Sequence, residues 1–318
     1  MLQNINKCGI IGCGFVGAST AFTLAKEGLF SEIVLLDIDE KKARGEALDI
    51  AHGMPFGFPV KIYAGKYSDL AECSLIIIAA GANQKEGETR LELVEKNAAI
   101  FRQIIPKVTQ VNQDCMLLIL SNPVDILTHI TLELSGFPPN RVIGSGTVLD
   151  TARFKFLLGD HFGVDMRNIH AFIIGEHGDS ELAVWSSANV SGIDLDQYCR
   201  ICGKCAGMKS LLQLFDDVKN SAYQIIEAKG ATHYAIAMST ARIVRAIVRN
   251  EHTVLTVSSL IDGHYDLSGV CLGVPSIVGS RGVEKILEIP LSDSEKFNLN
   301  QSAQTLKEIL QKVKKQNV

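Results

Sequence analysis

The sequence predicts an α/β protein with a doubly wound parallel sheet in its first part and a second, mixed α+β domain. Three observations support this prediction. Short, continuously apolar segments alternate with helical patterns over the first 145 residues, which is typical of parallel strands covered on both faces. A glycine-rich segment follows the first apolar run, and an acidic residue follows the second. Beyond that point the pattern changes, so we expect domains over residues 1–145 and 146–318.

The expected elements follow from the hydrophobic pattern along the chain. In the first half, apolar runs predict strands at residues 10–14, 32–39, 60–65, 74–81, 115–122 and 141–146, the last of which should close the sheet. Helical patterns there cover residues 16–27 and 90–111. The second half predicts a helix opening near 149, a strand at 170–179, helical stretches across 208–250, strands over 254–290 and an amphipathic helix at about 292–316.

Composition narrows the class of protein. Of 318 residues, 47% are hydrophobic, which is ample for a core, and a net charge of -4 gives no electrostatic reason to expect nucleic acid. No apolar run approaches the ~20 residues that cross a bilayer. The N-terminus lacks the pattern of a secretory signal. We therefore expect a cytoplasmic enzyme or binding protein without a membrane segment.

The eight cysteines are scattered, and most lie in apolar stretches, as buried reduced thiols do. One cluster, Cys199, Cys202 and Cys205, has the spacing of part of a metal site. The next position of the bacterial ferredoxin pattern is Lys209, and no second cysteine cluster completes a zinc site. We therefore expect three cysteines on a surface segment and no metal.

The glycine-rich segment predicts a dinucleotide site. Gly12, Gly14 and Gly17 match G-x-G-x-x-G between an expected strand and an expected helix. The first glycine makes the turn, the second lets backbone approach a pyrophosphate, and the third permits close helix–strand packing. Asp37 lies 20 residues beyond Gly17, where a carboxylate can accept from ribose hydroxyls. Ile38 follows it, rather than an arginine that would bind a 2′-phosphate, so NAD is favoured over NADP. The alternative interpretation is that the glycines only form a tight turn.

A histidine in the second half is the candidate acid–base group. His177 lies between small and acidic residues after an apolar run, and reduction of a ketone by hydride needs a proton donor that titrates near neutrality. Asp150 and Arg153 share one face of a helix. Asp150 could therefore orient His177 while Arg153 pairs with a substrate carboxylate. Spacing alone leaves open a surface ion pair or a helix cap.

The resemblance to a known family decides between these alternatives. The segments GCGFVG, AGANQKEGETRLELVEKN, SNPVDILT, GSGTVLDTARF, GEHGDSE and KGATHYAIA resemble, in the same order, those of the bacterial L-lactate dehydrogenases within the lactate/malate dehydrogenase family. The similarity runs essentially from end to end. A non-catalytic dinucleotide-binding protein would need no acid–base group or carboxylate anchor, so the presence of both disfavours that alternative.

The resemblance implies roles for individual residues. His177 would be the acid/base, Asp150 its orienting partner and Arg153 the anchor of the substrate carboxylate. Arg90, beside a glycine-flanked loop, would polarise the substrate carbonyl when that loop closes and excludes water. Further contacts are implied as follows: Asn122 and Thr232 with substrate, and Val16, Gly81, Ala82 and Asn122 with NAD.

Gln84 predicts which hydroxy acid is used. In the family this position meets the substrate side chain, and related malate dehydrogenases carry a cation there. A second carboxylate buried against a neutral amide would stay unpaired, at a cost of several kcal/mol. Lys85 should face the other way in an extended segment. Gln84 therefore favours pyruvate and L-lactate, with malate or longer-chain L-2-hydroxy acids as the alternative.

Two further residues predict regulation. Lys155 lies two residues beyond Arg153 and should therefore face away from the active site, and His170 opens the strand that leads to His177. In family members that respond to fructose 1,6-bisphosphate, the matching positions hold an arginine and a histidine. Lysine keeps the charge but loses the two-pronged grip on phosphate. The resemblance also implies a homotetramer.

Overall fold

The computed structural model describes residues 6–82, 90–204 and 208–315. Its largest feature is an eight-stranded sheet with the order β14-β13-β6-β5-β4-β1-β2-β3. Neighbouring strands from β1 to β6 are parallel. The predicted doubly wound parallel sheet is therefore confirmed. Its parallel strands are β1 (Lys7–Ile11), β2 (Glu32–Leu36), β3 (Lys61–Ala64), β4 (Leu75–Ile78), β5 (Met116–Ile119) and β6 (Val142–Gly144).

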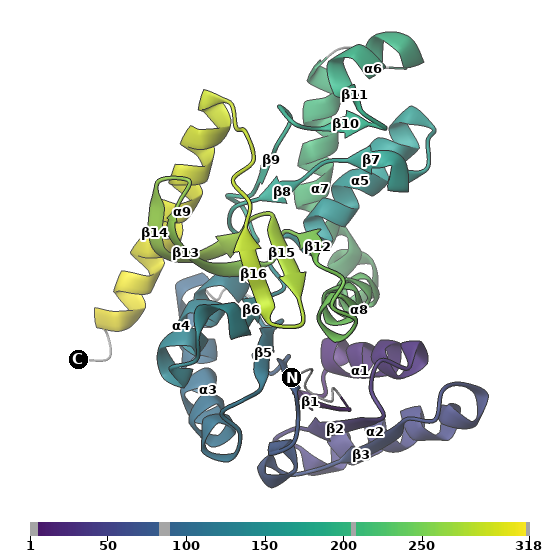
Figure 1. Cartoon of the computed structure of the whole chain (residues 1–318), viewed down its shortest axis with the longest axis vertical. Helices are drawn as coiled ribbons and strands as arrows, with labels where there is room; N and C mark the ends of the chain where they lie inside the picture. The colour runs from purple at the N-terminus through teal and green to yellow at the C-terminus, as the bar shows by residue number, and fades with distance from the viewer. Residues whose placement is uncertain (1–5, 83–89, 205–207, 316–318) are drawn as a thin grey trace.

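Helices cover both faces of this sheet (Figure 1). Alternate strand residues point to opposite faces, so Ile11 packs in the cluster with α3, α4 and α9 whereas Ile10 packs with α1, α2 and α8. Both faces are apolar because both are buried. These helices are α1 (Phe15–Glu27), α2 (Glu40–Gly53), α3 (Arg90–Val111), α4 (Val124–Ser135), α8 (Tyr234–Val248) and α9 (Asp293–Lys315).

One expectation about the sheet was wrong. The run at 141–146 was predicted to close the sheet, but β6 pairs on its outer side with β13 (Ser258–His264), which in turn pairs with β14 (Leu267–Gly273). Only Ser258 and Gly144 form the β13–β6 ladder. A Cβ on Gly144 would lie 2.9 Å from the Ser258 Cβ, so the absent side chain permits this close approach. The second half of the chain therefore completes the sheet of the first.

The remaining elements form a third apolar cluster and small sheets. The predicted single strand at 170–179 is instead two short strands that end at Gly175, whose φ of +93° stops the extended conformation. The remaining helices are α5 (Val148–Phe162), α6 (Leu195–Cys202) and α7 (Met208–Lys229). The remaining strands are β7 (Ile169–His170), β8 (Ile173–Ile174), β9 (Leu182–Ala183), β10 (Asn189–Val190), β11 (Ile193–Asp194), β12 (Thr253–Leu255), β15 (Ser276–Gly279) and β16 (Gly282–Ile286).

This topology defines where a ligand can bind. The chain turns in opposite directions from β1 and β4, which lie side by side, and the loops after their carboxyl ends meet at that switch point. The segments after β1, β2, β4 and β5 carry the predicted cofactor residues. Among the described helices, none is long and apolar enough to cross a membrane.

Candidate active site

The glycine-rich turn after β1 shapes the cofactor side of the site. Gly12 has a φ of +100°, and a Cβ there would lie 2.5 Å from the backbone nitrogen of Ala80. A Cβ on Gly17 would lie 1.8 Å from the Gly12 carbonyl oxygen. By contrast, a Cβ on Gly14 would meet nothing within 4 Å. Gly12 and Gly17 therefore serve packing, while Gly14 leaves open space at the start of α1.

That open space fits a dinucleotide pyrophosphate. Gly14 is the N-cap of α1 and makes no side-chain hydrogen bond to the first turn, so that end of the helix has no side-chain cap. An anion held there would be stabilised by the helix dipole. Val16 lies in the first turn, partly buried. The residues present thus fit the phosphate group that the motif predicts.

Asp37 follows β2 directly and reaches the same turn. One carboxylate oxygen accepts from the Cys13 backbone N–H at 2.6 Å, and the other accepts from the Asp39 backbone N–H at 3.0 Å. Asp37 thus also fixes the glycine-rich turn, a role that the sequence motif does not predict. Ile38 beside it is fully exposed, so an apolar side chain rather than a cation faces solvent here.

A buried asparagine connects the segments after β4 and β5. The Asn97 side chain accepts from the Ala82 backbone N–H at 2.7 Å and donates to the Asn122 carbonyl at 2.7 Å. Gly81, beside Ala82, would bring a Cβ to 3.2 Å from the Asn97 amide oxygen. Asn97 was not among the predicted residues, because a polar residue in a helical pattern gives no sign of what it contacts across the fold.

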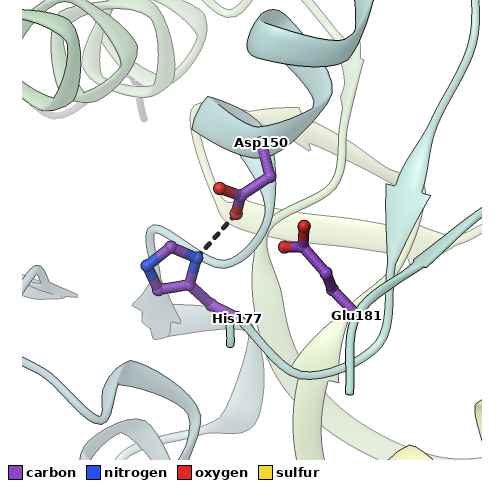
Figure 2. A group of neighbouring side chains, drawn as sticks. All are labelled: Asp150, His177 and Glu181. Carbon is purple, nitrogen blue, oxygen red and sulfur yellow. Dashed lines mark hydrogen bonds and ion pairs between the residues drawn. The ribbon is translucent and has the colours of Figure 1, made fainter. Parts of the chain in front are cut away.

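Two of the predicted catalytic side chains, those of His177 and Asp150, meet at the start of α5 (Figure 2). The His177 Nδ1 and an Asp150 oxygen are 2.6 Å apart. The other Asp150 oxygen accepts from the Arg153 Nη1 at 2.9 Å. Asp150 is buried, whereas His177 and Arg153 are partly exposed. One carboxylate therefore holds both a histidine and an arginine at the edge of the buried region.

Electrostatics favour the charged forms of this cluster. Burial alone would lower the pKa of His177, but the Asp150 charge and hydrogen bond raise the pKa to about 9. Burial would raise the pKa of Asp150, but the His177 and Arg153 charges lower it. His177 is therefore protonated at neutral pH and can donate a proton from its second ring nitrogen.

Two buried acids beside this pair were not predicted. Asp125, in the first turn of α4, accepts from the His177 backbone N–H at 2.8 Å and so fixes the peptide that carries the imidazole. Glu181 follows His177 by four residues and is also buried. Burial, with the nearby Asp150 charge, raises the pKa of Glu181 to about 8. Only the motif GEHGDSE signals Glu181, because acidic residues in loops are usually exposed.

Asp150, His177 and Glu181 also have the composition of a metal-binding cluster, with ligand atoms within 4.8 Å of one another. Both Asp150 oxygens are already hydrogen-bonded, one to His177 and one to Arg153. The guanidinium of Arg153 adds a positive charge where a cation would bind. These contacts favour an acid–base pair over a metal centre.

No hydrogen bond within the described ranges joins the other predicted residues to this cluster. Thr232 is partly buried between α7 and α8. Asn122 is exposed at the end of β5. Lys155 is partly buried on α5, and His170 is exposed in β7. Gln84 and the Arg90 side chain lie outside the described residues.

The cysteine run 199–205 begins on α6. Cys199 is in a disulfide bond and Cys202 has a free thiol, both partly buried, and Cys205 lies outside the described residues. The disulfide bond at Cys199 was not among the expectations from the sequence.

A glycine-rich turn that fits a dinucleotide phosphate, together with a protonated histidine held by a carboxylate, is typical of a nucleotide-dependent dehydrogenase. Comparison with known proteins narrows this class. The NAD-binding domain of lactate/malate dehydrogenases matches residues 6–144, and the α/β C-terminal domain of the same family matches residues 147–317. The chain belongs to the lactate/malate dehydrogenase family. It is therefore an NAD-dependent oxidoreductase.

Individual relatives agree with this assignment. The chain is 57% identical over 306 residues to an L-lactate dehydrogenase of Acetivibrio thermocellus, covering 96% of each chain. It is 55% identical to L-lactate dehydrogenase 1 of Clostridium acetobutylicum, covering 98% of this chain and 100% of the relative. Among solved structures, the ligand-bound minor L-lactate dehydrogenase of Enterococcus mundtii superimposes with a TM-score of 0.94 at 44% identity, covering 97% of this chain and 98% of the other.

Proposed function

We propose that this enzyme is an L-lactate dehydrogenase that interconverts pyruvate and L-lactate, with His177 as acid/base. The observation that carries the proposal is the Asp150 carboxylate held between His177 and Arg153. An enzyme that reduces a 2-keto acid needs a proton donor beside a cation for the substrate carboxylate. The relatives named L-lactate dehydrogenase support the choice of substrate.

NADH, when bound at the glycine-rich turn, supplies the hydride. Arg153 would pair with the substrate carboxylate and so orient the carbonyl toward the second nitrogen of His177. His177 would then donate that proton to the carbonyl oxygen while Asp150 keeps the ring oriented. In the reverse direction neutral His177 takes the hydroxyl proton. Asn122, Thr232 and the side chain of Arg90 would complete the substrate contacts.

Gln84 would select pyruvate over oxaloacetate. The test measures turnover with pyruvate, oxaloacetate and a longer 2-keto acid, following the loss of NADH absorbance. We expect a strong preference for pyruvate, and expect Gln84→Arg to shift the preference toward oxaloacetate because it pairs the second carboxylate. Lys85→Gln is the matched control and should leave the preference as it is. A wild-type preference for oxaloacetate would refute the assignment.

We also propose that fructose 1,6-bisphosphate modulates the enzyme through Lys155 and His170 in a homotetramer. Burial lowers the pKa of Lys155, so an incoming phosphate would compensate a poorly solvated charge. Lys155 and His170 lie on α5 and β7, which pack against each other. The bisphosphate should lower the KM for pyruvate in wild type and not in Lys155→Met. Equal KM values and equal sedimentation with and without it would rule out this regulation.

A further inference from the structure

The Glu181 carboxyl group is a buried acid that the reaction scheme above does not use. Glu181 is 6% exposed, and its Oε1 has no hydrogen-bond partner among the residues that the structure describes. Its carboxyl lies beside the Asp150–His177 pair, with one oxygen, a His177 ring nitrogen and an Asp150 oxygen all within 4.8 Å of one another (Figure 2). A buried carboxyl at this distance must affect the charges of the pair.

The two neighbouring acids are not equivalent. Asp150 has His177 and Arg153 as cationic hydrogen-bond partners. No described cation forms an ion pair with Glu181, and the nearby Lys219 of α7 instead donates to the Asp179 carbonyl at 3.2 Å. Two carboxylates this close in a buried site do not both ionise. The proton therefore resides on Glu181, and Asp150 carries the negative charge.

We propose that Glu181 is a positioning residue of the proton-transfer site, which remains a neutral carboxylic acid at neutral pH beside the Asp150 carboxylate. This inference rests on the proposed acid/base role of His177. The Glu181 proton stays on Glu181 throughout the reaction, and only His177 exchanges one with the substrate oxygen.

Neutral Glu181 keeps His177 an effective acid. With Glu181 uncharged, the cluster holds one negative charge on Asp150 against positive charges on His177 and Arg153. Ionised Glu181 would add a second negative charge, which would bind the imidazolium proton more tightly and weaken the attraction of Arg153 for a substrate carboxylate. The charged groups that face Glu181 are Asp150 and Arg153 of α5, His177 and Lys219; Asp125 faces His177 from α4.

The first test is spectroscopic and does not require turnover. The infrared difference spectrum between wild type and Glu181→Gln at pH 7 should contain the carbonyl band of a protonated carboxylic acid. In wild type alone, the band should disappear as the pH is raised above about 8, which supplies the evidence even if the variant does not fold. A difference spectrum with only carboxylate bands would overturn the proposal.

The second test separates KM from kcat. Between about pH 7 and pH 9 the KM for pyruvate should rise about threefold more in wild type than in Glu181→Gln, because only wild type gains a negative charge beside Arg153. Glu295→Gln is the matched control: Glu295 is buried but accepts hydrogen bonds from Ser186 and Ser292, and its pKa is lowered. It should retain the wild-type pH profile. Identical profiles for wild type and Glu181→Gln would contradict the inference.

These outcomes are distinguishable from failure of the proposed function. If His177 is not the acid/base, His177→Asn will keep its turnover while the protonated band of Glu181 remains in wild type. If His177 is the acid/base and Glu181 is ionised, His177→Asn will lose turnover and no protonated band will be found.

Discussion

Replacement of Asp150 by asparagine tests the electrostatic core of the site. The substitution keeps the size of the side chain but removes the charge that holds the proton on His177. The His177 pKa of about 9 lies about 2.5 above the ordinary value of 6.5, which corresponds to about 3.4 kcal/mol. Because Asp150 is 2% exposed and His177 is 25% exposed, solvent screens this interaction weakly. A pair of charges about 4 Å apart at an effective dielectric of 20 gives about 4 kcal/mol, which agrees.

The expected result is a loss of activity with a changed pH dependence. Without the Asp150 charge the His177 pKa returns to its ordinary value of 6.5 or below, so about one imidazole in four or fewer is protonated at pH 7, and kcat/KM for pyruvate should fall about fourfold or more there. In wild type the activity should persist through neutral pH and fall as the pH rises through about 9, because only protonated His177 donates. Without the charge, burial lowers the His177 pKa. As the pH rises, the activity of the variant should therefore begin to decline at about pH 6.5 or lower, well before that of wild type.

The assay is the pH profile of NADH oxidation with pyruvate, from about pH 5 to pH 10. Asp160→Asn is the matched control, because Asp160 is an exposed aspartate on the same helix. It should leave both the rate and the profile at wild-type values. If Asp150→Asn lost activity at pH 7 but kept the wild-type alkaline limb, the charge would not be what sets the His177 pKa, and the reasoning would fail.

Three more outcomes follow from the described contacts. Arg153→Lys should raise the KM for pyruvate about tenfold or more without weakening NADH binding measured by fluorescence, since a two-pronged charged contact is lost. Gly14→Ala should keep the wild-type Tm but weaken NADH binding, whereas Gly17→Ala should lower the Tm or prevent folding; the opposite order would contradict the open space at Gly14. The unfolding free energy of wild type should fall relative to that of Glu181→Gln as the pH rises from about 4.5 to about 8, because folded Glu181 keeps a proton that the unfolded chain releases. Denaturant unfolding that gives the same pH dependence for both proteins would argue against a protonated Glu181.

Most of the first half was predictable because local pattern and fold coincide there. Continuous apolar runs such as 74–81 predict strands buried on both faces, and β4 is fully buried. The glycine spacing predicts the turn after β1 because positive φ and close packing tolerate no Cβ at Gly12 and Gly17. The i, i+3 spacing brought Asp150 and Arg153 to one helix face. These are properties of a few consecutive residues, which a sequence displays directly.

Tertiary structure decided what depends on residues far apart in the chain. The β13–β14 hairpin joins the sheet of the first half, because β6 still has an unpaired edge, and no local pattern encodes that partner. The Asn97 bridge and the burial of Glu181 beside Asp150 likewise arise when separate segments meet. The charge of a carboxyl group depends on such neighbours. In the sequence each carboxyl group is an ordinary acid, whereas in the fold Asp150 is an anion and Glu181 a neutral acid.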